Sequence, residues 1–201
     1  MLTSHDVSSL VTDSLCDQAG EQNATVAGFY FDFAAQKDQS PGSTMGALLK
    51  QVISGLEEIP EEISQAFKKQ KRALGGRGPQ LTDIVKMLQT ISSKERMFIC
   101  IDALDECLPE HRVKLLVSLK QILEKSPDTR IFVTGRPHIR PEIGRRLPGR
   151  VTSRPIGTKR DDIIRYLRSK LEEDTTPDAM DSSLEADILE KIPEDISEMY
   201  V

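Results

Sequence analysis

The sequence predicts an α/β protein in which a parallel sheet is flanked by helices. Segments rich in strand-forming residues alternate with stretches of ten or more residues that have helical periodicity, and this alternation is typical of parallel sheets with right-handed crossovers. The segment Met97–Ile101 is an unbroken apolar run, as in strands that are buried on both faces. It leads into a cluster of acidic residues, which places polar groups where the ligands of such sheets gather.

The first half of the chain combines one strand-like segment with several helical patterns. The strand candidate, Val26–Phe33, is rich in β-formers. Pro41 and Gly42 mark the polar loop after it, and Pro60 suits the first turn of a helix that Gly75 ends. The expected elements are a helix over residues 6–16, the strand over 26–33, and helices over 44–56, 60–74 and 81–91.

The second half continues the alternation after the central apolar run. Pro109 opens a long amphipathic helix, and Arg130–Thr134 is the next strand. Thr158 and Asp161 resemble a capping box at the start of a later helix. Further expected elements are a weaker strand over 151–156 and helices over 158–171 and 184–192. We expect residues 1–172 to form one domain, and residues 173–201 to be a linker and the start of a following helical region.

The composition is that of an ordinary globular protein. Of the 201 residues, 38% are hydrophobic and 29% are charged. Aromatic residues make up 4% and tryptophan is absent, which argues against a stacking surface for single-stranded nucleic acid. The net charge is −5 and no long block of lysine and arginine stands out. We therefore expect no nucleic-acid partner.

The cysteines and the termini indicate the compartment. Cys16, Cys100 and Cys107 show no CxxC or Cys/His ligand spacing. The amino terminus has no basic region followed by an apolar core, so no secretory signal is expected. No apolar run approaches the length of about 20 residues that crosses a bilayer. We expect a cytoplasmic protein with reduced thiols and no membrane partner.

Two consecutive strands end in polar functional groups. The first ends in Asp102, Asp105 and Glu106, and the second in Thr134 and Arg136. Because the carboxyl ends of parallel strands share one edge, these groups are expected to face a common site. A carboxylate for Mg²⁺ and an arginine for a terminal phosphate are the parts that nucleotide hydrolysis requires. The non-functional alternatives are that the acidic residues only form a turn after a buried strand, and that Arg136 is a surface arginine before a proline-defined turn.

These two segments resemble a known family. FICIDALDE followed by RIFVTGRP is similar to the Walker B and sensor 1 pair of NACHT-type P-loop NTPases, and most of all to the nephrocystin 3-like amino-terminal domain of fungal NLR-like (STAND) proteins. FYFDF, LLKQVISGL and KIPEDISEMYV resemble other stretches of that family.

The resemblance implies a role for each candidate residue. Asp102 would bind Mg²⁺ through water, with Thr134 beside it in the nucleotide site. Asp105 or Glu106 would activate the attacking water, and Arg136 would sense the γ-phosphate. The implied cofactors are Mg²⁺ and ATP or GTP, and the implied partners are the nucleotide and homologous NLR-like proteins.

The phosphate-binding loop of that family, GxxxxGK[ST], does not occur in these 201 residues. The glycine-rich pieces SPGSTMG and GGRGPQ lack the lysine and are expected to be turns. We therefore expect a three-layer, P-loop NTPase-like sheet without its first strand, as in a fragment, a truncated gene model or a degenerate copy. The chain alone is expected to have no measurable ATPase activity. The alternative is a non-catalytic interaction module, or a decoy that associates with intact homologues.

Overall fold

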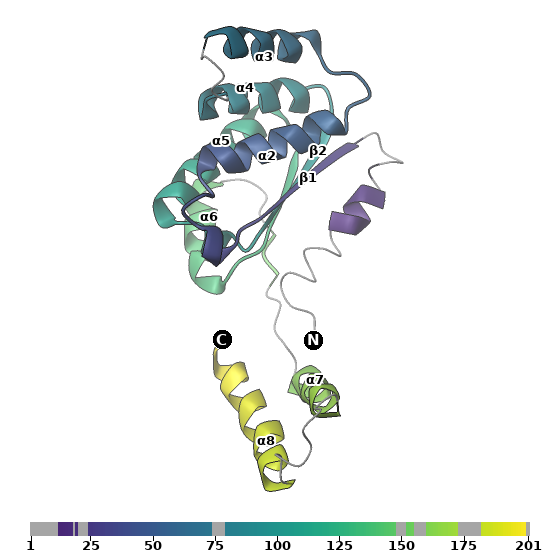
Figure 1. The fold of residues 1–201 in the computed structure, drawn as a ribbon, viewed down its shortest axis with the longest axis vertical. Helices are drawn as coiled ribbons and strands as arrows, with labels where there is room; N and C mark the ends of the chain where they lie inside the picture. The colour runs from purple at the N-terminus through teal and green to yellow at the C-terminus, as the bar shows by residue number, and fades with distance from the viewer. Residues whose placement is uncertain are drawn as a thin grey trace. The chain divides into compact units, whose positions relative to one another are not determined.

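The computed structural model describes residues 12–17, 19, 24–73, 79–147, 152–154, 160–172 and 182–199. The chain divides into two compact units, Leu2–Val151 and Thr152–Val201. The first unit contains a sheet with its helices, and the described part of the second contains two helices (Figure 1). Each unit is described by itself.

A three-stranded parallel sheet organises the first unit. It consists of β1 (Ala24–Tyr30), β2 (Arg96–Asp102) and β3 (Arg130–Val133) in the order β1-β2-β3. Tyr30 lies beside Asp102 in the register, and Ile101 lies beside Val133. The carboxyl ends of all three strands therefore meet at one edge, as the sequence predicts.

Strand β2 is central because its residues are apolar on both faces. Met97, Ile99 and Ile101 alternate with Cys100 and Asp102, and all five are at most 4% exposed. Successive side chains of a strand point to opposite faces, so both faces of β2 are covered. The central strand predicted over 97–101 is confirmed and extends one residue further at each end.

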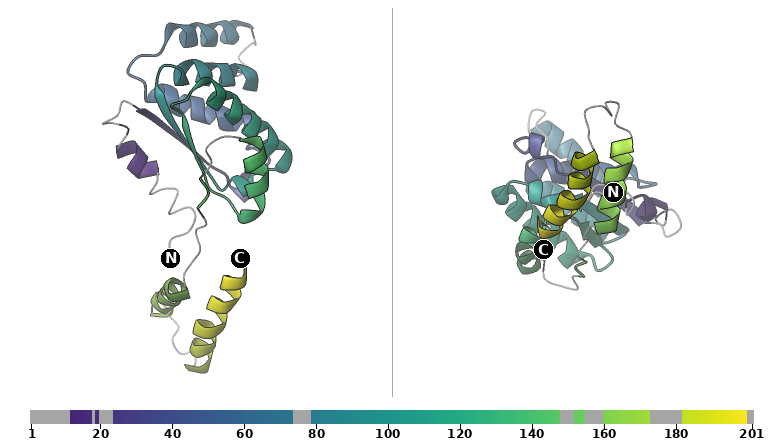
Figure 2. Two further views of the ribbon diagram at one scale, coloured as in Figure 1. Left: turned by 180° about the vertical axis from the view of Figure 1, so that it is seen from behind. Right: turned by 90° about the horizontal axis from the view of Figure 1, so that it is seen from below.

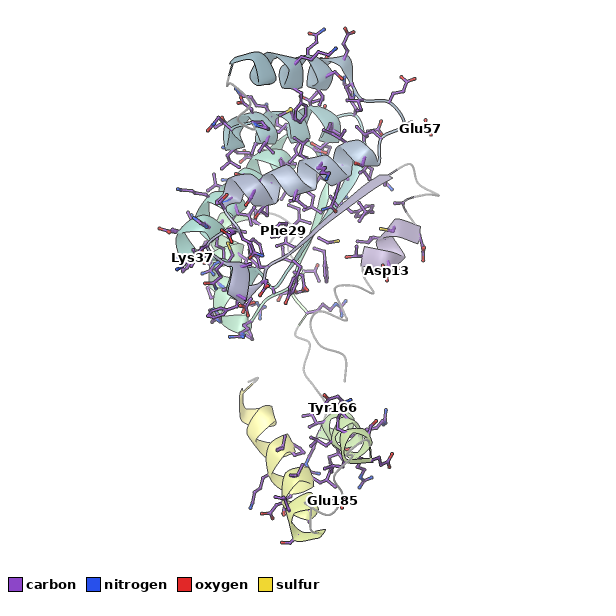
Figure 3. The ribbon with its side chains drawn as sticks, in the orientation of Figure 1. Asp13, Phe29, Lys37, Glu57, Tyr166 and Glu185 are labelled. Atoms are coloured by element: carbon purple, nitrogen blue, oxygen red, sulfur yellow. The ribbon has the colours of Figure 1, made fainter. Side chains whose placement is uncertain are left out.

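Helices α2 (Pro41–Ser54), α4 (Leu81–Ser92) and α5 (Pro109–Lys125) cover one face of the sheet (Figures 1 and 2). Phe29 of β1 packs on this side against the buried core (Figure 3). Helix α3 (Glu61–Ala73) lies outside α4 and contributes Ile63 to the same core. The core thus lies between the sheet and these helices, which form two layers of the fold.

A helical segment over residues 12–17 lies on the opposite face of the sheet, as the front and back views show (Figures 1 and 2). Burial raises the pKa of the Cys100 thiol of β2, and the nearby Thr12 side chain of this segment lowers it in part. Helices on both faces of a parallel sheet confirm the predicted α/β class. Residues 6–11 of the helix expected there lie outside the described part of the chain.

Two element boundaries differ from the sequence prediction because of helix capping. The first strand ends at Tyr30, since Asp32 accepts a hydrogen bond from the Ala34 N–H and starts the short helix η1 (Phe33–Ala35). Helix α2 begins at Pro41 rather than at residue 44. Ser40 caps it by accepting from the Ser43 N–H, so SPGSTMG is a helix start and not a turn.

After β3 the chain forms two short helices that the sequence did not predict, η3 (Pro137–Ile139) and α6 (Arg140–Arg146). Two prolines in this stretch favour a loop reading, but each stands at the first turn of its helix, where the missing N–H costs nothing. The weaker strand predicted over 151–156 is not a strand at residues 152–154, and its other residues lie outside the described part.

The second unit contains α7 (Arg160–Glu172) and α8 (Ser182–Met199), which pack against each other. Figure 3 marks Tyr166 on α7 and Glu185 on α8. Helix α8 continues through Pro193, beyond the end predicted at residue 192. The domain boundary predicted after residue 172 stays a prediction. Among the described residues, no helix combines the length and the apolar character needed to cross a membrane.

Candidate functional site

Thr134 joins the end of β3 to the end of β2 through four hydrogen bonds. Its N–H donates to the Ile101 carbonyl at 2.9 Å, and its carbonyl accepts from the Leu104 N–H at 3.0 Å. Its hydroxyl donates to the Asp102 carboxylate and accepts from the Ala103 N–H at 3.0 Å. The Asp102 carboxylate, which belongs to a residue only 4% exposed, is therefore held by a hydroxyl from the neighbouring strand.

Ala103 turns the chain sharply after Asp102. It has a left-handed conformation with φ 51° and ψ 45°, which costs a residue with a Cβ about 1–2 kcal/mol. The hydrogen bonds from the N–H groups of Ala103 and Leu104 to Thr134 hold this turn. The turn places Asp105 and Glu106 in the short helix η2 (Leu104–Glu106) at the edge of the sheet.

Arg136 brings the two acidic residues of η2 together. Its Nε lies 3.3 Å from Asp105 Oδ2, and its Nη2 lies 3.4 Å from Glu106 Oε1. The Arg136 backbone N–H also donates to Asp105 Oδ1 at 3.1 Å. The Arg136 side chain is 70% exposed, whereas those of Asp105 and Glu106 are 7% and 20% exposed. A solvent-facing cation thus covers two recessed carboxylates.

Gly135 permits this approach between the two strand ends. A Cβ at Gly135 would lie 2.6 Å from Ile139 Cδ1 and 3.2 Å from Asp105 Oδ1. Gly135 is not among the residues that the sequence predicts for the site. Its position directly between Thr134 and Arg136 was the available signal, because a glycine after a strand often marks a close backbone approach.

Two further side chains, which the sequence pattern does not single out, support residues 105–107, here called the acidic segment. Gln36 Nε2 donates to the Glu106 carbonyl at 2.7 Å, and Arg112 Nη1 donates to the Cys107 carbonyl at 3.0 Å. The sequence pattern alone does not predict either contact. Burial raises the pKa of the Cys107 thiol to about 11; the nearby Arg112 charge lowers it and the Glu142 charge raises it. This thiol is therefore a neutral packing group beneath the site.

The donor chemistry at the edge of the sheet fits Mg²⁺ in part. Asp102 and Thr134 present oxygen atoms, the ligand type that Mg²⁺ takes in proteins. No group of three or more His, Cys, Asp or Glu side chains in the described part of the chain is arranged to hold a metal ion. The residues thus suit an ion held mainly by water and phosphate oxygens, as Mg²⁺ usually is with nucleotides.

A sequence model of the family described as Nephrocystin 3, N-terminal, matches residues 7–136. The chain belongs to this family. The matched segment of the nephrocystin 3 N-terminal family runs from before β1 through Arg136, so it includes Asp102, Asp105, Glu106 and Thr134. Together with the α/β sheet, this match confirms the P-loop NTPase-like relationship. The NACHT-type, fungal and Walker B assignments remain predictions.

Comparison with solved structures finds the Aeropyrum pernix ORC1 protein in complex with DNA, at 17% sequence identity and a TM-score of 0.48. The match covers 84% of this chain and 40% of the ORC1 chain. This chain therefore spans less than half of the length of that protein. Comparison with curated protein sequences finds no match.

Our exclusion of a nucleic-acid partner is wrong as stated, because the matched ORC1 protein is seen in complex with DNA. The DNA contact is a property of ORC1. The net charge of the whole chain is a poor criterion for this prediction, because it hides local differences in charge. Residues 130–160 hold eight arginines and one lysine against a single acid, Glu142, although the net charge of the chain is −5. A negative total therefore does not exclude polyanions.

Proposed function

We propose that the carboxyl edge of the sheet is the part of a nucleotide-binding switch that contacts Mg²⁺ and the γ-phosphate, in a NACHT-type module of an NLR-like signalling protein. One observation carries the proposal. Arg136, from the end of one strand, bridges Asp105 and Glu106 from the end of the neighbouring strand, next to the Asp102–Thr134 pair. Enzymes of phosphoryl transfer use carboxylates together with a positively charged side chain, and both are present at this edge of the sheet.

Each residue of the edge has a distinct role in this proposal. Asp102, with Thr134 beside it, would hold Mg²⁺, and the bound ion would neutralise phosphate charge. Asp105 or Glu106 orients and deprotonates the attacking water. Arg136 contacts the terminal phosphate, for which its planar guanidinium has the matching donor geometry.

The pairing of Arg136 suggests how the switch operates. Arg136 lies within ion-pair distance of both carboxylates that it covers. A terminal phosphate competes for the same guanidinium, because it offers more negative charge and several acceptor oxygens. Transfer of Arg136 to the phosphate would release Asp105 and Glu106 toward water. Gain or loss of the phosphate would then change the ion pairing at this edge of the sheet.

The 201 residues contain no GxxxxGK[ST] sequence, so they supply no backbone cradle or lysine for the phosphates. We therefore expect this chain alone to bind nucleotide weakly and to have no measurable ATPase activity. Turnover by this chain that Asp102→Ala abolishes would contradict that expectation. ATP and GTP are both compatible with the residues at the edge.

The test uses the full-length product of the gene and measures binding of fluorescent ATP and GTP with and without Mg²⁺. We expect Asp102→Asn to weaken Mg²⁺-dependent binding by about tenfold or more. Arg136→Ala should weaken triphosphate binding while leaving diphosphate binding nearly unchanged. Arg145→Ala, an exposed arginine of α6, is the control. Absence of Mg²⁺-dependent binding to the wild-type protein would refute the proposal.

A second candidate function is a non-catalytic module that associates with intact homologues. Among the described residues, β3 pairs with β2 alone, and its Ile131, Phe132 and Val133 are only half-buried. An open edge strand with apolar side chains favours pairing with another chain. Co-purification with a full-length homologue would support this candidate, and a monomer that captures no homologue would refute it.

A further inference from the structure

A buried arginine links the acidic segment to α6. Arg112 lies in the first turns of α5 and is 8% exposed. Its Nε donates to Glu142 Oε2 at 2.8 Å, and its Nη1 donates to the carbonyls of Cys107 at 3.0 Å and Asp105 at 3.5 Å. A guanidinium stays charged when buried, so each of these acceptors compensates lost hydration.

Glu142 belongs to the segment that carries Arg136. Helix α6 follows Arg136 directly through η3, and the Glu142 side chain is 18% exposed. Its Oε1 lies 3.5 Å from Arg146 Nε, one turn later in the same helix. Glu142 therefore stands between a buried arginine of α5 and an arginine of α6.

Two links thus connect the same pair of segments. The outer link is the ion pair between the solvent-facing Arg136 and the recessed Asp105. The inner link is the buried pair of Arg112 and Glu142, which reaches the backbone on both sides of Glu106 through the carbonyls of Asp105 and Cys107. The inner link fixes the backbone from which the two carboxylates of the outer site project.

We propose that Arg112 is a positioning residue that, with Glu142, holds the acidic segment so that Asp105 and Glu106 face Arg136, and that couples this alignment to the position of α6. The functional meaning of the alignment rests on the proposed nucleotide site. The alignment itself rests on the contacts above. A movement of α6 would displace Glu142, release Arg112 and loosen the backbone of the acidic segment.

The energetics of buried ion pairs favour this role over a purely stabilising one. Replacing both partners of a buried pair by apolar side chains is often neutral or stabilising, whereas removing one partner strands a buried charge. The pair is therefore a poor device for stability alone. What an apolar pair cannot supply is a donor to the carbonyls of Asp105 and Cys107.

The test compares Arg112→Met, Glu142→Leu and the double variant in the nucleotide-free chain. Three quantities are measured: the denaturation midpoint, the Nε–H NMR signal of Arg136, and the alkylation rate of Cys107, identified by mass spectrometry. Cys107 is 3% exposed and its carbonyl accepts from Arg112, so its reaction reports opening of the acidic segment. Arg145→Met, on the exposed side of α6, is the matched control.

We expect each single variant to lower the midpoint and the double variant to recover most of it. In the double variant the Arg136 Nε–H signal should still shift, and Cys107 should still react about tenfold faster or more than in the wild type. If all three quantities in the double variant equal those of the wild type, the pair is merely structural and the inference is wrong.

Arg112→Lys provides a second route if the double variant does not fold. It keeps the charge toward Glu142 but loses the planar fork, so Cys107 protection should fall while the midpoint changes little. Unchanged protection in Arg112→Lys would overturn the inference. Because no nucleotide enters these measurements, their failure is distinct from a failure of nucleotide binding in the full-length protein.

Discussion

At the residue scale, the candidate site depends on two small residues that directly follow β3. Thr134 supplies a hydroxyl that both donates to Asp102 and accepts from the Ala103 N–H. Gly135 leaves the space that Asp105 and Ile139 occupy. These contacts align the larger and charged residues around them, so we expect the site to be sensitive to the addition of a single methyl group.

Replacing Gly135 by alanine should disturb the alignment of the two strand ends. The added Cβ would meet Ile139 Cδ1 at 2.6 Å and Asp105 Oδ1 at 3.2 Å, and such overpacking typically costs about 1–3 kcal/mol. Chemical denaturation measures the loss. Gly144→Ala in α6 is the control, because nothing lies within 4 Å of its Cβ position. Equal effects of the two substitutions would contradict the assigned role of Gly135.

The Cys107 thiol gives a prediction on pH. Burial raises its pKa from the ordinary value of 9.0 to about 11, so the folded protein holds this proton more tightly than the unfolded chain does. The resulting stabilisation is complete below pH 9 and is lost as the pH rises toward about 11. The stability of wild type should therefore fall more steeply over this range than that of Cys107→Ala. Parallel profiles would contradict the prediction.

At the element scale, the two outer strands of the sheet differ in the contacts at their outer edges. The outer edge of β1 is closed by Gln51 of α2, whose amide accepts from the Gly28 N–H at 2.9 Å and donates to the Gly28 carbonyl at 2.8 Å. This pair of bonds imitates a neighbouring strand. At the other side of the sheet, β3 pairs with β2 and with no further strand among the described residues.

Replacing Gln51 by alanine should open the edge of β1. Both Gly28 bonds are lost, which we expect to reduce stability by about 1–2 kcal/mol. The freed N–H and carbonyl then favour pairing between chains. Light scattering over a concentration series measures the association, and Lys50→Ala, an exposed neighbour in α2, is the control. Unchanged association would show that the cap has no protective role.

At the scale of the whole molecule, the chain consists of two compact units, Leu2–Val151 and Thr152–Val201. All five candidate site residues lie in the first unit, at the carboxyl ends of β2 and β3. The second unit contributes α7 and α8, which pack against each other. The division between the units falls before α7, whereas the sequence predicts a boundary after it.

Truncation tests where the first unit ends. We expect residues 1–151 and residues 1–172 to have midpoints of thermal unfolding within about 2 °C of each other, because α2, α4 and α5, the described helices that cover the sheet, precede residue 151. Scanning calorimetry measures both fragments. A markedly less stable fragment 1–151 would instead support the boundary predicted after residue 172.

The sequence by itself determined the parallel α/β sheet, since an unalternating apolar run such as Met97–Ile101 is stable only when covered on both faces. It also determined that Asp102 and Arg136 share one edge, because parallel strands end together. Helix α4 was predicted within one residue for a related reason: its apolar spacing of three and four residues is a local property.

Tertiary structure alone decided how the edge is held. The hydroxyl of Thr134 on Asp102, the space at Gly135 and the pairing of Arg112 with Glu142 join residues about 30 positions apart. The sequence pattern also did not predict α6 or the caps at Asp32 and Ser40. Periodicity records which faces are buried, whereas capping and long-range hydrogen bonds depend on distances that form only when the chain has folded.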